Sequence, residues 1–148
     1  MPGNAAIYIA DPSLLGSRFF DKIEGIKSYE GINMGTSATG VRFNLDPGQI
    51  AMNFMPEHQV AQHLNGFSGF AQRIIQDKDQ LIYAQARIHN VRLVCGCIVT
   101  PDFDQGGKLL DFLFRFNGAV NGLLFYSDTI FDYDGQALGG KLKGHGQS

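Results

Sequence analysis

The stretch that decides the fold class is residues 91–100, VRLVCGCIVT, which is apolar, rich in β-branched side chains and followed directly by Pro101. A run of this kind with little alternation is typical of a strand buried on both faces of a sheet. Proline ends it because proline cannot donate to a strand ladder. Residues 5–10, AAIYIA, have the same character and also end before a proline. We therefore expect two central strands.

Apolar periodicity and turn residues predict the elements around these strands. They are a helix over 13–23, a hairpin of 41–45 with 50–55, helices over 56–75 and 77–90 that are either separate or one kinked element, a helix over 108–120, a strand over 123–126 and a hairpin of 129–132 with 137–138. The intervening segment 26–40 is rich in Gly, Ser, Thr and Asn, so we expect a loop there with at most a short extended piece.

This order predicts an α+β fold. Its first six elements match a ferredoxin-like split βαβ core, an antiparallel-rich sheet with helices on one face, and the C-terminal helix, strand and hairpin would extend that sheet. A chain of 148 residues is close to the commonest domain size. We expect one domain over residues 1–138 and a flexible, Gly- and Lys-rich tail over 139–148.

Composition narrows the class of partner. Twelve Lys and Arg against fourteen Asp and Glu give a formal charge of −2, with no basic block that would neutralise phosphates, so a nucleic-acid partner is not expected. The first residues do not resemble a signal peptide, and no apolar run approaches the roughly 20 residues of a membrane span. We expect a protein that neither enters nor crosses a membrane.

The two cysteines, Cys95 and Cys97, point the same way from one strand. We expect reduced, metal-free core side chains, because this spacing does not favour a disulfide and no other ligands lie near in sequence. This usage fits a reducing compartment, and the expected location is cytoplasmic. His58 and His63 are five residues apart, which does not place two ligands on one helical face.

The loop before the third helix is a candidate ligand site. Asp102 and Asp104 follow a strand and Lys108 begins a helix, the position where many α/β folds bind ligands. The spacing matches neither a Walker loop nor an EF-hand, so helix capping by Asp104 is favoured over binding. A second acidic group, Asp128, Asp132 and Asp134, could bind a cation, but an Asp-Gly turn explains the last pair without any ligand and is favoured. No metal or cofactor is expected.

The third helix, 108–120, carries apolar residues around most of its circumference. A sheet covers only one side of a helix, so such a helix is either enclosed within its own domain or packs against another chain. We predict that at least one of Phe112, Phe114 and Phe116 is exposed in the monomer and lies in a protein interface. The partner would be another protein or a second copy.

Residues 92–104, RLVCGCIVTPDFD, followed by a helix, by Gly122-Leu123-Leu124-Phe125 and by Asp132-Tyr133-Asp134-Gly135, resemble the C-terminal half of small bacterial α+β domains, some of which are immunity proteins that block a secreted toxin. The resemblance covers about a third of the chain and implies no catalytic residues. It implies a non-catalytic protein-interaction domain, such as an immunity protein or adaptor. The alternative is a small enzyme or ligand sensor that uses Asp102 and Asp104 with a histidine.

Overall fold

The computed structural model describes residues 3–15, 23, 26, 28–34, 38–45, 48–100 and 107–140. The elements, in chain order, are β1 (Gly3–Ile9), a 3₁₀ turn (Pro12–Leu15), β2 (Ser28–Met34), β3 (Ala38–Asn44), β4 (Gln49–Phe54), α1 (Glu57–Ile74), α2 (Lys78–His89), β5 (Leu93–Thr100), α3 (Lys108–Ala119), β6 (Leu123–Tyr126), β7 (Thr129–Phe131) and β8 (Ala137–Gly139). The predicted α+β class is confirmed.

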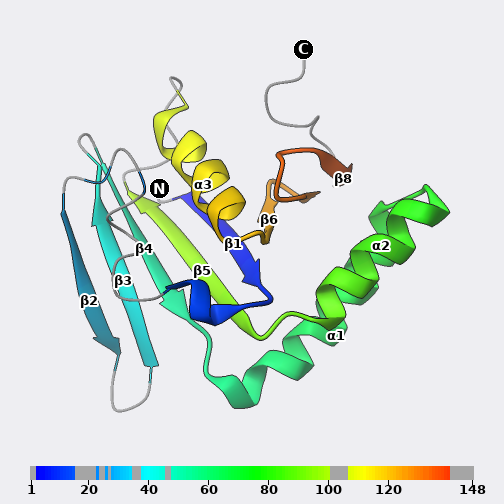
Figure 1. The fold of residues 1–148 in the computed structure, drawn as a ribbon, viewed down its shortest axis with the longest axis horizontal. Coiled ribbons are helices and arrows are strands. Elements are labelled where there is room, and N and C mark those ends of the chain that lie inside the picture. The colour runs from blue at the N-terminus through cyan, green and yellow to red at the C-terminus, as the bar shows by residue number, and fades with distance from the viewer. Residues whose placement is uncertain are drawn as a thin grey trace.

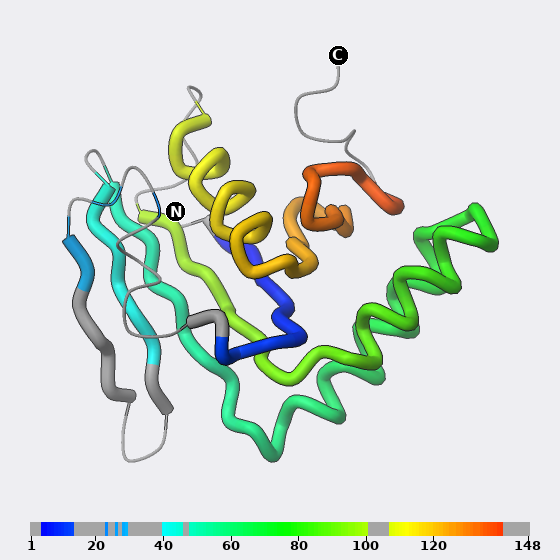
Figure 2. Tube along the Cα trace, viewed as in Figure 1, coloured from blue at the N-terminus to red at the C-terminus, as the bar shows by residue number. Residues whose placement is uncertain are grey.

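All described strands form one antiparallel sheet in the order β2-β3-β4-β5-β1-β6-β7-β8. Both predicted central strands are central: β5 lies between β4 and β1, and β1 lies between β5 and β6 (Figure 2). The predicted C-terminal strand and hairpin extend the sheet as β6, β7 and β8.

The strand order departs from the split βαβ plan, which would place β1 between β4 and β5. The cause is the pair of helices that joins these two strands. A single helix carries the chain to the opposite end of a sheet, whereas two antiparallel helices return it to the end that it left. Consequently β5 runs antiparallel to β4 directly beside it, with Phe54 paired to Cys95.

Two hydrophobic cores lie on opposite faces of the sheet, so the helices do not share one face. On one face, α3 packs over alternate residues of the central strands, including Ile7, Ile9 and Cys97. On the other face, α1 and α2 pack as a helical hairpin over Tyr8, Val94 and the C-terminal strands. Figure 1 shows α3 lying across the sheet and the α1–α2 hairpin extending beyond it.

Three sequence predictions need correction or fall outside the described residues. The expected loop at 26–40 contains β2 and the start of β3, because an edge strand can form through backbone pairing without an apolar pattern. Of the expected helix over 13–23, the structure describes only the 3₁₀ turn and Ile23. Of the expected tail, Gly139 belongs to β8 and Gly140 is also described, whereas 141–148 lie outside the described residues.

The predicted start of α2 is confirmed in detail. Asp77 occupies the N-cap position and its carboxylate accepts a hydrogen bond from the backbone N–H of Gln80 at 3.0 Å. This bond satisfies one of the free N–H groups at a helix start. The two predicted helices are therefore separate elements, divided between Ile74 and Lys78.

Candidate functional site

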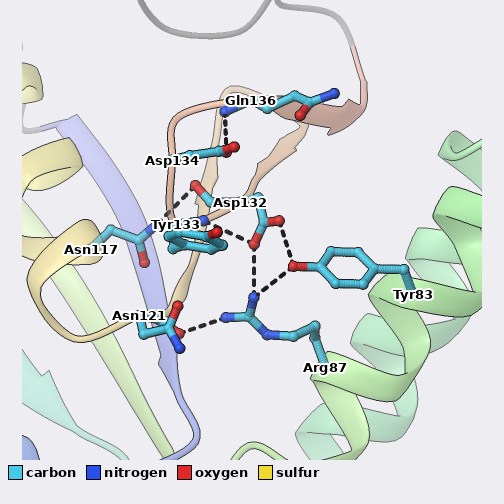
Figure 3. A network of polar contacts seen from close by, with 8 residues as sticks. All are labelled: Tyr83, Arg87, Asn117, Asn121, Asp132, Tyr133, Asp134 and Gln136. Carbon is cyan, nitrogen blue, oxygen red and sulfur yellow. Dashed lines mark hydrogen bonds and ion pairs between the residues drawn. The ribbon is translucent and has the colours of Figure 1, made fainter.

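A polar cluster joins α2 to the turn between β7 and β8 (Figure 3). The Arg87 guanidinium lies 2.9 Å from Asp132 Oδ1, and the Tyr83 hydroxyl donates to Asp132 Oδ2 at 2.6 Å. Arg87 also donates to the Tyr83 hydroxyl at 2.9 Å and to the carbonyl oxygen of Asn121. One carboxylate therefore holds two side chains from the neighbouring helix.

Local sequence explains both halves of this cluster. Tyr83 and Arg87 are four residues apart, so they lie on one side of α2. Asp132 begins a tight turn in which the Gly135 N–H donates to the Asp132 carbonyl at 3.0 Å. Gly135 has a φ of 86°, which a glycine adopts without strain. The Asp-Gly turn predicted from the sequence is thus present, and it points the Asp132 carboxylate towards α2.

The cluster is electrically neutral, and both oxygens of the Asp132 carboxylate accept hydrogen bonds, whereas the buried Asn117 Oδ1 has no donor among the described residues. Asp132 has a further donor in the N–H of Tyr133, at 2.9 Å, and Asn117 donates to its carbonyl oxygen at 3.3 Å. Burial raises the pKa of the Tyr83 hydroxyl, the hydrogen bond to Asp132 raises it further, and Arg87 opposes both effects. Tyr83 therefore remains a hydrogen-bond donor at neutral pH.

Two tyrosine rings flank this buried pair at the surface. The guanidinium carbon of Arg87 lies 5.8 Å from the ring centroids of both Tyr83 and Tyr133, within the range of a cation–π contact. Both rings are exposed. We call Tyr83, Arg87 and Tyr133 the tyrosine surface.

A pocket of about 680 Å³ lies between α1 and α2, on another side of α2. We call it the helix-hairpin pocket. Its apolar lining comes from Val60 and Leu64 of α1, from Ile88 of α2 and from Val91. Its polar lining consists of Glu57, Asn65, Ser68, Gln85, His89 and Arg92. No described residue forms a hydrogen bond or ion pair with any of these six side chains.

The predicted exposure of Phe112, Phe114 or Phe116 is wrong. They are 1%, 8% and 1% exposed within a single chain. Phe112 and Phe116 contact Phe43 of the sheet. Phe114 packs edge-on against Phe131 of β7, with 4.9 Å between the ring centroids. The C-terminal strands thus cover a second side of α3. The prediction failed because it assumed that the sheet covers only one side of this helix. These three side chains cannot form an interface in this conformation.

The candidate ligand loop is only partly visible. Asp102 and Asp104 lie outside the described residues, while Lys108 is the exposed first residue of α3. Gly107, with a φ of 74°, holds the N-cap position that the sequence assigned to Asp104. Within the ranges that the structure describes, no group of three or more His, Cys, Asp or Glu side chains could hold a metal ion.

The cysteines lie where the sequence placed them. Cys95 and Cys97 are free and buried in the core beneath α3. Burial raises the pKa of the Cys95 thiol to about 12 and that of Cys97 well above its usual value. His58 and His63 are exposed on α1, and His63 Nε2 lies 2.8 Å from the hydroxyl of buried Tyr8.

No known protein family, curated protein or solved structure matches this chain. The resemblance to bacterial immunity proteins therefore stays a prediction. Among the described helices, none combines the length and the apolar character needed to cross a membrane.

Sequence reasoning missed the tyrosine surface because Asp132 had a sufficient local explanation in its turn. A weak signal was present, because Tyr83 and Arg87 are four residues apart and lie on one side of the predicted helix. Their partner, Asp132, is 45 positions away from Arg87. Only the fold brings these side chains together.

Proposed function

We propose that the chain is a non-catalytic protein-binding domain and that the tyrosine surface is its contact site. The observation that carries this proposal is the pair of exposed tyrosine rings held on either side of one arginine. Tyr and Arg are the residue types most often found at the energetic centre of protein interfaces. The proposed interface therefore lies on α2 and the β7–β8 turn, and not on α3 as the sequence predicted.

The cluster beneath the surface favours binding because it orders the arginine and one tyrosine in advance. Arg87 is held by Asp132 and by the Asn121 carbonyl, and Tyr83 is held by Asp132. A partner would not have to immobilise these side chains, which reduces the entropy cost of association.

Charge defines the class of partner. The two charges beneath the tyrosine surface, Arg87 and Asp132, neutralise each other at 2.9 Å. The complementary surface is therefore an uncharged apolar or aromatic patch on another protein. Within this class we propose that the partner is a bacterial toxin and that this chain is a cytoplasmic immunity protein. This identity rests on the sequence resemblance and on the cysteine usage.

The test begins with the intact, tagged chain expressed in its own cells. Proteins that bind wild type but not a Tyr133→Ala variant are identified by mass spectrometry. Each is then purified and titrated calorimetrically against the wild type and Tyr133→Ala. Ile98→Asp is the matched control, because Ile98 is also exposed but lies on β5.

We expect Tyr133→Ala to weaken binding about 30-fold or more, the value for an interface hot spot. The thermal midpoint should change little because this side chain is exposed. Loss of binding in Ile98→Asp alone would move the contact to the sheet and reject the proposal. So would a purified chain that forms a dimer dissociated by Tyr133→Ala, since the partner would then be a second copy.

A further inference from the structure

The sheet face opposite α3 is only partly covered by helices. Among the described helices, only α1 and α2 pack on this face, over Tyr8, Val94 and the C-terminal strands. In Figure 1 their hairpin extends away from β2, β3 and β4. Ala51 of β4 belongs to neither hydrophobic core, and Ile98 of β5 is 40% exposed. We call the part of this face formed by β2, β3, β4, β5 and the start of β1 the open sheet face.

Gly96 leaves a space in the centre of the open sheet face. It lies in β5, between Ala6 of β1 and Asn53 of β4 in the sheet register. Apart from its chain neighbours, a Cβ atom at Gly96 would have only the Asn53 carbonyl oxygen within reach, at 3.9 Å. By contrast, a Cβ atom at Gly40 would collide with the Met52 carbonyl. The glycine at position 40 is therefore required by its own strand pair, whereas the glycine at position 96 is not.

The described part of the chain gives no steric reason for a glycine at position 96. Its backbone does not adopt the left-handed conformation that favours glycine. Glycine weakens a strand, because it has more conformational freedom to lose and no side chain to pack. Within strands it often marks a place where a ligand or another backbone approaches closely. The space above Gly96 is therefore open to a partner.

Ile98 is the side chain that fits this space. It lies two residues after Gly96 in β5, so both positions point to the open sheet face, about 7 Å apart. The same face thus has an exposed aliphatic side chain beside an empty position. In a two-fold dimer, residue i of one copy contacts residue j of the other, and the reverse contact also forms. We propose that two copies of the chain pack their open sheet faces together, with Ile98 of each copy seated over Gly96 of the other.

The polar residues around this pair suit contact between two identical faces. Asn4 and Asn53 lie on the neighbouring strands, in register with Ile98 and Gly96. An amide side chain both donates and accepts hydrogen bonds, so an amide of one copy can pair with an amide of the other. Arg42 is paired in the sheet register with Glu30. The charges of this pair balance, so two copies of the face do not repel each other.

The size of the open sheet face sets the strength of the contact. Its five strands, about 4.8 Å apart and about six residues long, cover roughly 480 Å² per copy. Two copies would bury about 1,000 Å², the lower limit of a specific interface. We therefore expect a weak dimer, with a dissociation constant of about 10–100 μM. The tyrosine surface lies on other elements, so this contact is independent of the proposed function.

Sedimentation velocity of the full chain measures this self-association over about 1 μM to 1 mM protein, a range that brackets the expected dissociation constant. Gly96→Ile fills the space, and Ile98→Asp places a charge where an aliphatic side chain should be buried. A double variant, Gly96→Ile with Ile98→Gly, exchanges the two residues, so that side chain and space again lie opposite each other. Ile82→Asp is the matched control, because Ile82 is 67% exposed but lies on α2.

We expect Gly96→Ile and Ile98→Asp each to weaken the dimer about tenfold or more. The double variant should restore most of the wild-type association. At about 1 μM, where a dimer this weak is dissociated, the thermal midpoint of Gly96→Ile should equal or exceed that of the wild type, because isoleucine favours strands and meets open space. Ile82→Asp and Tyr133→Ala should dimerise as the wild type does.

A chain that sediments as a monomer up to about 1 mM, the usual limit of weak binding, would overturn the proposal. So would a dimer that persists in Gly96→Ile, or one that the double variant fails to restore. A lower thermal midpoint in Gly96→Ile would show that the monomer itself fills the space, and this result would also reject the contact. Each of these outcomes leaves the tyrosine surface unaffected, because its test depends on Tyr133→Ala.

Discussion

Replacement of Asp132 by alanine should strongly destabilise the protein. Only 9% of the Asp132 side chain and 20% of the Arg87 side chain are exposed. The change removes the acceptor for Arg87, for the Tyr83 hydroxyl and for the Tyr133 N–H. It also leaves a cation in a mostly buried position without its partner.

The size of the effect follows from this exposure. Removal of one partner from a fully buried ion pair costs about 3–5 kcal/mol. Because Arg87 is still 20% exposed, water can solvate part of its charge, and we expect a loss of about 2–4 kcal/mol in the free energy of unfolding. This is a large share of the roughly 5–15 kcal/mol that holds a typical domain together.

Urea denaturation followed by far-UV circular dichroism measures this loss, and the slope against denaturant should remain that of the wild type. Asp111→Ala is the control, because the Asp111–Arg115 pair is exposed on α3 and should contribute only about 0.3–0.5 kcal/mol. A double-mutant cycle of Asp132→Ala with Arg87→Ala isolates the coupling between the two side chains. A loss in Asp132→Ala no larger than that in Asp111→Ala would refute this account.

Three further predictions concern the core and a helix start. Cys97→Ser should lower the free energy of unfolding by about 1–3 kcal/mol in urea denaturation, because the 3.8 Å contact of the Cys97 sulfur with the Cys95 carbonyl is too long for an O–H···O hydrogen bond and the buried hydroxyl would be poorly satisfied. Burial raises the pKa of the Cys95 thiol to about 12, whereas an unfolded thiol titrates near about 8.5. The unfolded state therefore loses its proton first, and the free energy of unfolding should fall as the pH rises from about 9 to about 12. Urea titrations across this range should show a smaller fall in Cys95→Ala. Asp77→Ala should cost about 1 kcal/mol through loss of the α2 cap, and a thermal midpoint equal to that of the wild type would contradict the capping role.

Prediction from the sequence was correct where burial produces an apolar run or a periodic apolar pattern. The apolar runs of β1 and β5 and the periodic patterns of α1, α2 and α3 each match the described element closely. The edge strand β2 has no such pattern, because its pairing with β3 depends on backbone hydrogen bonds. The order of the strands was also beyond the sequence, since it depends on α1 and α2 returning the chain to the same end of the sheet.

The candidate site followed the same division. The turn at Asp132 was predictable because its residues are neighbours in the chain. The hydrogen bond from Arg87 to Asp132 depends on how α2 is oriented against the β7–β8 turn. The error over Phe112, Phe114 and Phe116 had a similar origin, because the position of β7 beside α3 is a property of the assembled sheet.

The central place of β1 sets an order on biosynthesis. A ribosome makes β1 before either of its partner strands, since Ala5 pairs with Cys97 of β5 and Ala6 pairs with Phe125 of β6. Pairings between such distant segments form slowly, and exposed apolar strands are prone to aggregate while they wait. A nascent chain that has reached only the end of α2 therefore has no strand on either side of Ile7 and Ile9, and chaperone contact with the growing chain should concentrate there.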